Sequence, residues 1–189
     1  MNLPRLLTGC VKALGRNPEW ERYFDFSKRA LQQSFIAVAL SLPFYYVCAA
    51  AVQNQRATIS GAETATSLPA AAFIIILGLY ALTFVMSAYI IAMVFDKLAT
   101  FRAWVIVRHW SIFFAAKMAA IVMGLNLAGL LPFPWAIYPV MGIYLLTLAI
   151  DIRLAARIAG FEWGAAVLTG CLITAMGLTI LLIGVAQYV

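Results

Sequence analysis

The chain has 189 residues, of which 65% are apolar or aromatic and only 11% are charged, with a net charge of +6 at pH 7. An average soluble protein is roughly 45–50% apolar and about 25% charged, and the mean hydropathy here is +0.97. One soluble domain cannot bury so much apolar surface, which excludes a cytosolic enzyme, a secreted disulfide-rich domain and a disordered chain. The hydrocarbon core of a bilayer tolerates such a surface.

Residues 1–30 are predicted to form a cytoplasmic segment built on an amphipathic helix. Apolar side chains recur there at helical spacing and share one face: Leu3, Leu6, Leu7, Cys10, Val11 and Leu14. Arg5, Lys12 and Arg16 fall on the opposite face, a pattern typical of a helix that lies in the membrane interface. Pro18 ends this helix. The segment either anchors the first span or recruits a cytoplasmic partner.

Residues 31–189 are predicted to form a transmembrane domain. Crossing about 30 Å of hydrocarbon at 1.5 Å per residue takes roughly 20 apolar residues. Five segments meet that length: about 31–52, 68–95, 110–131, 135–152 and 164–187. Pro132 and Pro134 separate the third and fourth spans, which should therefore form a tight antiparallel hairpin. The predicted fold class is an all-α integral membrane protein, a bundle of five transmembrane helices with an N-terminal amphipathic interfacial helix.

Lysine and arginine are unevenly distributed over the predicted connections. Eleven of the thirteen precede span one or lie between spans two and three or between spans four and five. The connection before span three is predicted to carry Lys97, Arg102 and Arg108, whereas Arg56 alone lies on the other side. Because cytoplasmic loops carry an excess of Lys and Arg, the N-terminus is predicted to be cytoplasmic and the C-terminus to lie outside.

Lys117 is the one ionisable side chain predicted to lie deep inside a span. Such a group is expensive at membrane depth and is by default a functional hypothesis. Asp96 and Asp151, near the inner ends of neighbouring spans, are able to pair with it, and Asn126 adds a polar group deeper in span three. These four residues form the candidate intramembrane polar site. Lys117 either snorkels or forms a structural ion pair, or it belongs to a site for an anion, a lipid headgroup or a proton.

Three glycines in span five, Gly170, Gly177 and Gly184, fall seven residues apart on one helical face. Small residues let a neighbouring helix approach closely, which favours association in lipid. We expect this seam to pack helices either within one subunit or in a homo-oligomer. Span one carries a similar stripe of small residues: Ser34, Ala37, Ser41 and Cys48.

The sequence gives no positive indication of catalysis. It contains no GxxxxGK[ST], HExxH or GxSxG motif, and its single histidine, His109, has no nearby cysteine or carboxylate with which to bind a metal. We therefore expect no enzyme activity, no metal and no cofactor. Orientation explains the positive charge, so nucleic acid is not an expected partner. The expected partners are anionic lipids of the inner leaflet, together with a protein or a second copy of the chain.

Three stretches of sequence carry a resemblance to a known family. They are residues 26–35 (FSKRALQQSF), residues 101–111 (FRAWVIVRHWS) and residues 151–157 (DIRLAAR). The arrangement resembles the five-span inner-membrane proteins of bacteria that are distantly similar to the Yip1 family. The resemblance implies a multi-pass protein of the bacterial inner membrane and no settled biochemical activity. The short acidic motif of eukaryotic Yip1 proteins is not recognisable, so no role in vesicle traffic follows.

The sequence supports two classes of function. The leading hypothesis is a non-enzymatic integral protein of the inner membrane that works through lipid or protein contacts on its basic cytoplasmic face. The alternative is a small transporter or channel in which Lys117 and the carboxylate of Asp96 or Asp151 line the path. A membrane enzyme acting on lipids would need polar groups that converge in one pocket.

Overall fold

The computed structural model describes residues 2–15, 17–61 and 69–186, and this part of the chain is helical, with no strand. A short α-helix, α1 (Leu3–Leu14), and a 3-10 helix, η1 (Pro18–Tyr23), come first. Five long helices follow: α2 (Lys28–Ser60), α3 (Ala70–Val94), α4 (Leu98–Leu127), α5 (Phe133–Arg157) and α6 (Trp163–Ala186). All five are long and apolar enough to cross a membrane. The all-helical class and the five apolar helices of the prediction are confirmed.

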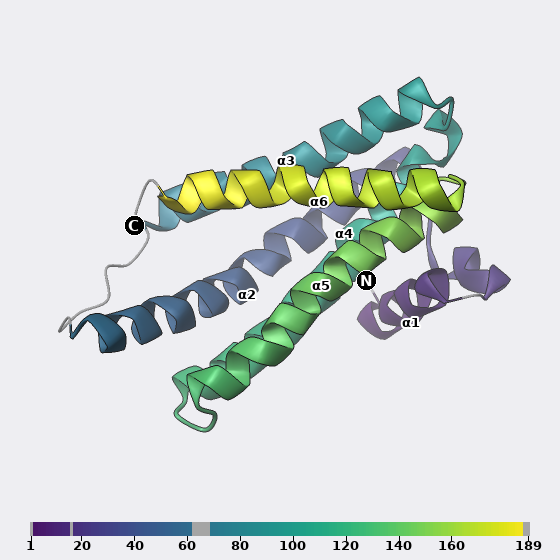
Figure 1. Ribbon diagram of the computed structural model, residues 1–189. Coiled ribbons are helices and arrows are strands. Elements are labelled where there is room, and N and C mark those ends of the chain that lie inside the picture. The colour runs from purple at the N-terminus through teal and green to yellow at the C-terminus, as the bar shows by residue number, and fades with distance from the viewer. Residues whose placement is uncertain (1, 16, 62–68, 187–189) are drawn as a thin grey trace.

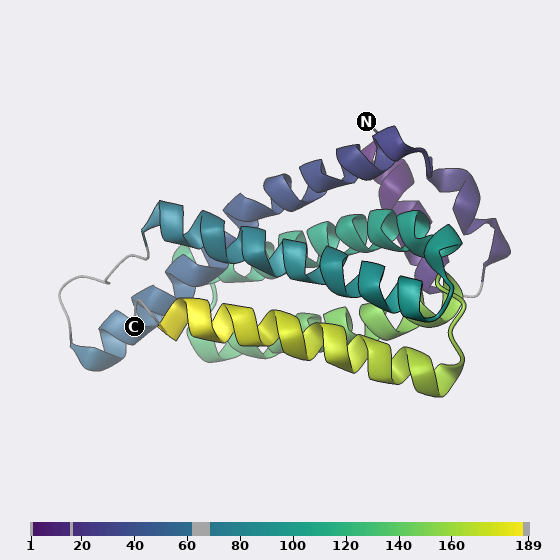
Figure 2. The same cartoon turned by 90° about the horizontal axis from the view of Figure 1, so that it is seen from above.

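The five long helices run alternately up and down and form two layers, with α3 and α6 lying over α2, α4 and α5 (Figure 1). The starts of α2, α4 and α6 meet the ends of α3 and α5 at one end of the bundle, where α1 also lies (Figure 2). We call this the basic end, because it carries Lys28, Arg29, Lys97, Arg102, Arg153 and Arg157. The opposite end, where α6 finishes, is called the far end.

Local sequence signals set the ends of α1 and α2. The side chain of Asn2 accepts a hydrogen bond from the backbone N of Arg5, and that of Ser27 accepts one from the backbone N of Ala30. Both are N-cap arrangements. At its other end α2 stops at Gly61, whose φ of 67° is left-handed and favours glycine. Because nothing before Gly61 breaks the helix, α2 continues beyond the predicted end at residue 52.

The largest difference from the prediction is at the start of α4. This helix begins at Leu98 rather than at residue 110, because α3 and α4 are joined only by a tight turn in which Asp96 has a φ of 56°. Arg108 and His109, predicted in a cytoplasmic connection, lie inside α4 and are each 3% exposed. That prediction is wrong. Arg102 and Arg108 lower the mean hydropathy of the first turns of α4, so a prediction from hydropathy starts the span too late.

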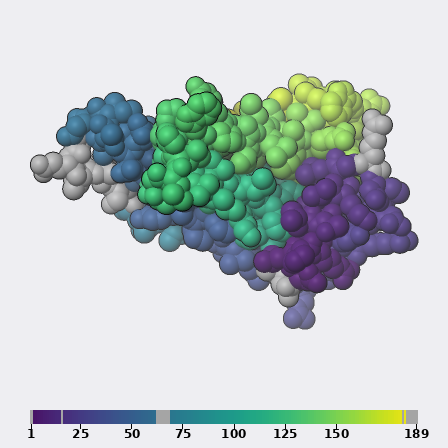
Figure 3. Space-filling model, turned by 90° about the horizontal axis from the view of Figure 1, so that it is seen from below, coloured from purple at the N-terminus to yellow at the C-terminus, as the bar shows by residue number. Residues whose placement is uncertain are grey.

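Helix α1 packs against α4 and α5 at the basic end instead of lying apart from the bundle (Figure 3). Cys10 and Ala13 are buried, and Leu3, Leu6 and Leu14 pack beside them against the core. Leu7 and Val11, on the same predicted apolar face, stay 44% and 62% exposed. The amphipathic face is thus divided between contacts with the protein and an exposed apolar strip.

Two arginines of α5 bind the last residue of α1 and the connection that follows it. The Nε of Arg153 donates to the backbone O of Leu14 at 3.2 Å, and an Nη of Arg157 donates to the backbone O of Asn17 at 3.5 Å. The last carbonyls of a helix have no partner within the helix and carry partial negative charge, so cations bind well there. The N-terminal segment is therefore tied to α5.

Candidate functional site

A buried ion pair joins α4 to α5. The Nε of Arg108 lies 2.7 Å from Oδ1 of Asp151, and Nη2 lies 3.3 Å from Oδ2. The two residues are only 3% and 2% exposed. A charge out of contact with water needs a partner, and two parallel N–H···O bonds are the strongest form of an arginine–carboxylate contact.

The pair lies well inside the bundle. Arg108 is ten residues from the start of α4, which corresponds to about 15 Å along the helix, and Asp151 is six residues, about 9 Å, from the end of α5. Both therefore lie between the ends of helices that are apolar enough to span a membrane. An ionisable pair at such a depth is where a functional site is first sought.

Residues of α3 and α6 complete the surroundings of the pair. The guanidinium carbon of Arg108 lies 3.8 Å from the centre of the Phe84 ring and 5.9 Å from that of Tyr80, within the range of cation–π contacts. The hydroxyl of Thr174 donates a long hydrogen bond of 3.5 Å to Oδ2 of Asp151. Four of the five long helices thus contribute a side chain to this site.

His109, the neighbour of Arg108, faces α2. Its Nδ1 is 2.9 Å from the hydroxyl of Ser34, a member of the predicted stripe of small residues. Its Nε2 is buried and has no hydrogen-bond partner among the described residues. This histidine therefore joins α2 to α4 next to the ion pair.

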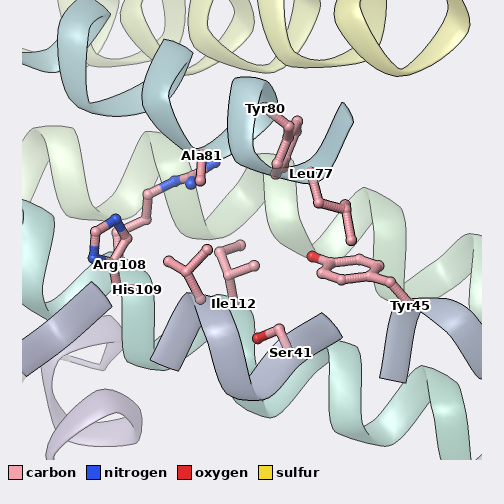
Figure 4. Close-up of a pocket in the computed structure, with 9 residues that line it drawn as sticks. Ser41, Tyr45, Leu77, Tyr80, Ala81, Arg108, His109 and Ile112 are labelled. Atoms are coloured by element: carbon pink, nitrogen blue, oxygen red, sulfur yellow. The ribbon is translucent and has the colours of Figure 1, made fainter. Parts of the chain in front are cut away.

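Small cavities flank the ion pair on both sides. One of about 30 Å³, the size of a single water molecule, is lined by Arg108, His109, Tyr45 and Tyr80 (Figure 4). A larger one of about 340 Å³ lies between α3, α5 and α6 and reaches Asp151. Tyr80 lines both cavities, so the pair and this tyrosine separate them.

The residues of the predicted polar site do not gather around Lys117. Lys117 is exposed on α4, and among the described residues it makes no ion pair with Asp96 or Asp151. Asp96 is exposed in the turn between α3 and α4. Asp151 pairs with Arg108, rather than with Lys117 or the arginines that follow it. The Nδ2 of Asn126 donates to the backbone O of Leu131 at 2.9 Å and so stabilises the turn before α5.

The glycine seam of α6 packs against two helices of the same chain. A Cβ on Gly170 would lie 2.5 Å from Cγ1 and 2.9 Å from the backbone N of Ile152 in α5. A Cβ on Gly177 would lie 2.7 Å from the ring of Tyr80 in α3. These two glycines therefore permit close contacts within one subunit. Gly184 also lies in α6, and its surroundings are outside the described residues.

Sequence reasoning missed Arg108 as a member of the site. The signal lay in the run WVIVRHWSI at 104–112, where apolar residues flank Arg108 and His109 on both sides. Asp151 was identified, but its partner follows only from the packing of α4 on α5. Among the described residues no three His, Cys, Asp or Glu side chains lie close enough together to hold a metal ion.

Comparisons with known proteins found no family, no curated protein and no solved structure that matches this chain. The geometry of the ion pair, the cavities and the two ends of the bundle is therefore the basis for interpreting its function. The pair itself offers no nucleophile. It is a neutral, hydrogen-bonded unit that links helices and lies between two cavities.

Proposed function

We propose that this chain is a non-enzymatic, multi-pass protein of the bacterial inner membrane that acts through lipid contacts on its basic end. That end would face the cytoplasm, because cytoplasmic segments are enriched in Lys and Arg. One observation carries the proposal. Among the described residues, every Lys and Arg except Arg56, Lys117 and the buried Arg108 lies in α1, in η1 or at the basic end of the long helices.

The exposed cations of the basic end support contact with anionic headgroups. Lys28, Arg29 and Arg102 are exposed and, within the described part of the chain, form no ion pair. Each such residue near an anionic leaflet contributes about 1 kcal/mol of attraction. The exposed strip of Leu7 and Val11 on α1 adds apolar surface at the same end. Cations and apolar side chains together are what an anionic membrane surface binds.

A charge-matched pair of variants tests this proposal. Lys28→Gln with Arg29→Gln removes two cations from the basic end, and Arg56→Gln with Lys117→Gln removes two from elsewhere on the surface. Native mass spectrometry of each protein after extraction from membranes measures the phosphatidylglycerol that stays bound. We expect the first variant to retain less of this lipid than the wild type, and the second to retain as much. Equal loss in both variants would show that the basic end has no special role.

The cavities favour a small transporter or channel as the second function. The sequence suggested a path lined by Lys117, but in the structure Arg108 and Asp151 are the charged residues beside these two cavities. In this version the ion pair would lie on the path of a small solute. Proteoliposomes loaded with a pH-sensitive or a chloride-sensitive dye test it. Flux above that of empty liposomes, and lost in Asp151→Asn but not in Lys117→Gln, would support transport.

The distant relationship to the Yip1 family belongs to the same proposal. It rests on the three sequence stretches, which contact one another in the fold. Ser34, from residues 26–35, contacts His109, from residues 101–111, and Arg108 of that second stretch pairs with Asp151, from residues 151–157. The stretches that carry the resemblance therefore converge on one buried site.

A further inference from the structure

A further cavity lies between the two layers of helices towards the far end and shares Tyr144 and Leu181 with the cavity that reaches Asp151. Its volume is about 280 Å³, and all five long helices contribute to its wall. It extends along α2 from Tyr45 to Arg56, eleven residues or about 16 Å. In Figure 1 this is the region where α3 and α6 diverge from α2, α4 and α5. The far end thus has a partly open apolar cavity between the two layers.

The wall of this cavity is apolar along its length and polar at its two ends. Phe73, Met123 and Val140 are among the apolar side chains of the wall. Tyr45 lies at the inner limit, where it also lines the small cavity beside Arg108. Arg56 lies at the outer limit, is exposed, and is the only charged residue among the described residues that line the cavity. An apolar cavity with a cation at its outer end matches a molecule with an apolar tail and an anionic head.

The volume limits the tail to one short chain. A cavity of 150 Å³ holds one benzene molecule, so 280 Å³ holds roughly ten to twelve carbon atoms on the same scale. Two acyl chains of a phospholipid would not fit within this volume. We propose that the far-end cavity binds a single-chain carboxylate of about this length, with its tail between the two layers and its carboxylate on the guanidinium of Arg56.

This inference does not depend on the function proposed for the basic end. The two involve opposite ends of the bundle and different residues. The variants at the basic end leave the far-end cavity unchanged. Arg56→Gln is used in both tests, and we expect it to have no effect on bound phosphatidylglycerol. Loss of dodecanoate binding with phosphatidylglycerol retained, or the reverse, would therefore show which of the two proposals fails.

Dodecanoate carrying a photoreactive diazirine at the end of its tail is a suitable probe. The wild-type protein in nanodiscs is irradiated with the probe, and adducts are located by peptide mass spectrometry. Unlabelled dodecanoate and dodecanol serve as competitors. We expect adducts in the segment 45–56 of α2 and competition by dodecanoate at about tenfold lower concentration than by dodecanol, since a charged hydrogen bond contributes about that factor.

Three variants make the test specific. Arg56→Gln should remove the preference for dodecanoate over dodecanol. Because Arg56 is exposed, this variant is expected to fold like the wild type. Ala49→Phe fills the cavity from α2 and should abolish the adducts, whereas Ala71→Phe, at an exposed position of α3 outside the cavity, should not. Equal competition by dodecanoate and dodecanol in the wild type would overturn the proposal. So would retention of phosphatidylglycerol in the cavity in place of dodecanoate.

Discussion

Removing one partner of the Arg108–Asp151 pair should destabilise the protein far more than removing both. A single substitution leaves a buried charge without compensation, which costs about 3–5 kcal/mol. The structure also ranks the two single variants. In Asp151→Leu the remaining guanidinium keeps the Phe84 ring at 3.8 Å, a contact that contributes up to about 2 kcal/mol when desolvated. In Arg108→Met the remaining carboxylate keeps only the long bond from Thr174 at 3.5 Å.

We therefore expect Arg108→Met to be about 1–2 kcal/mol more destabilising than Asp151→Leu, because of that cation–π contact. The double variant Arg108→Met/Asp151→Leu should fall within about 1 kcal/mol of the wild type, since a buried pair is often replaced by apolar side chains at little cost. Exposed Arg102 on the same helix provides a control, Arg102→Met, with an effect below about 0.5 kcal/mol.

Thermal unfolding in detergent measures these differences. For a chain of this size 1 kcal/mol corresponds to about 2–4 °C in Tm, so each single variant should lose roughly 6–20 °C. The double variant should recover most of that loss. The reasoning is refuted if the two single effects simply add in the double variant, or if both single variants unfold at the wild-type temperature.

Three further predictions concern the seam of α6, the docked α1 helix and the lone lysine. Gly170→Ala should destabilise the protein by about 1–3 kcal/mol, because the added Cβ would meet the backbone of Ile152. The control Gly164→Ala should change stability by less than about 1 kcal/mol, because nothing lies within 4 Å of the added Cβ. Equal effects of the two variants in thermal unfolding would disprove the close contact. Burial raises the pKa of the Cys10 thiol to about 12, so maleimide at pH 8 should label it roughly a thousandfold more slowly than an exposed cysteine. Fast labelling of the folded protein would mean that α1 is not docked. Lys117→Met should alter stability by less than about 0.5 kcal/mol, because the side chain is exposed, and a loss above 2 kcal/mol would reveal a partner.

The helices themselves were predictable because their signals are local. Apolar runs of sufficient length define a span wherever they occur, and caps such as Ser27 and Gly61 mark ends that depend on only a few neighbouring residues. The amphipathic pattern of residues 3–14 likewise predicts α1. It does not say which part of the apolar face meets protein, because that depends on how α4 and α5 pack at the basic end.

The ion pair was not predictable in the same way. Arg108 and Asp151 are 43 residues apart, and hydropathy counts each as a penalty, although together they are neutral. Because each residue was judged on its own, the sequence-based prediction placed Arg108 outside the span. It placed Lys117 inside the span, since apolar residues follow it. Only the packing of α4 against α5 shows which ionisable side chain is compensated.

Placing the basic end in the cytoplasm is most directly tested by thiol labelling in intact cells. In a background with Cys10, Cys48 and Cys171 replaced by alanine, single cysteines are introduced at exposed positions as Ser60→Cys at the far end and Arg102→Cys at the basic end. A maleimide that cannot cross the inner membrane is added to spheroplasts before and after lysis. We predict that Ser60→Cys is labelled at once and Arg102→Cys only after lysis. The opposite pattern, or labelling of both in intact spheroplasts, would contradict a membrane-spanning bundle with a cytoplasmic basic end.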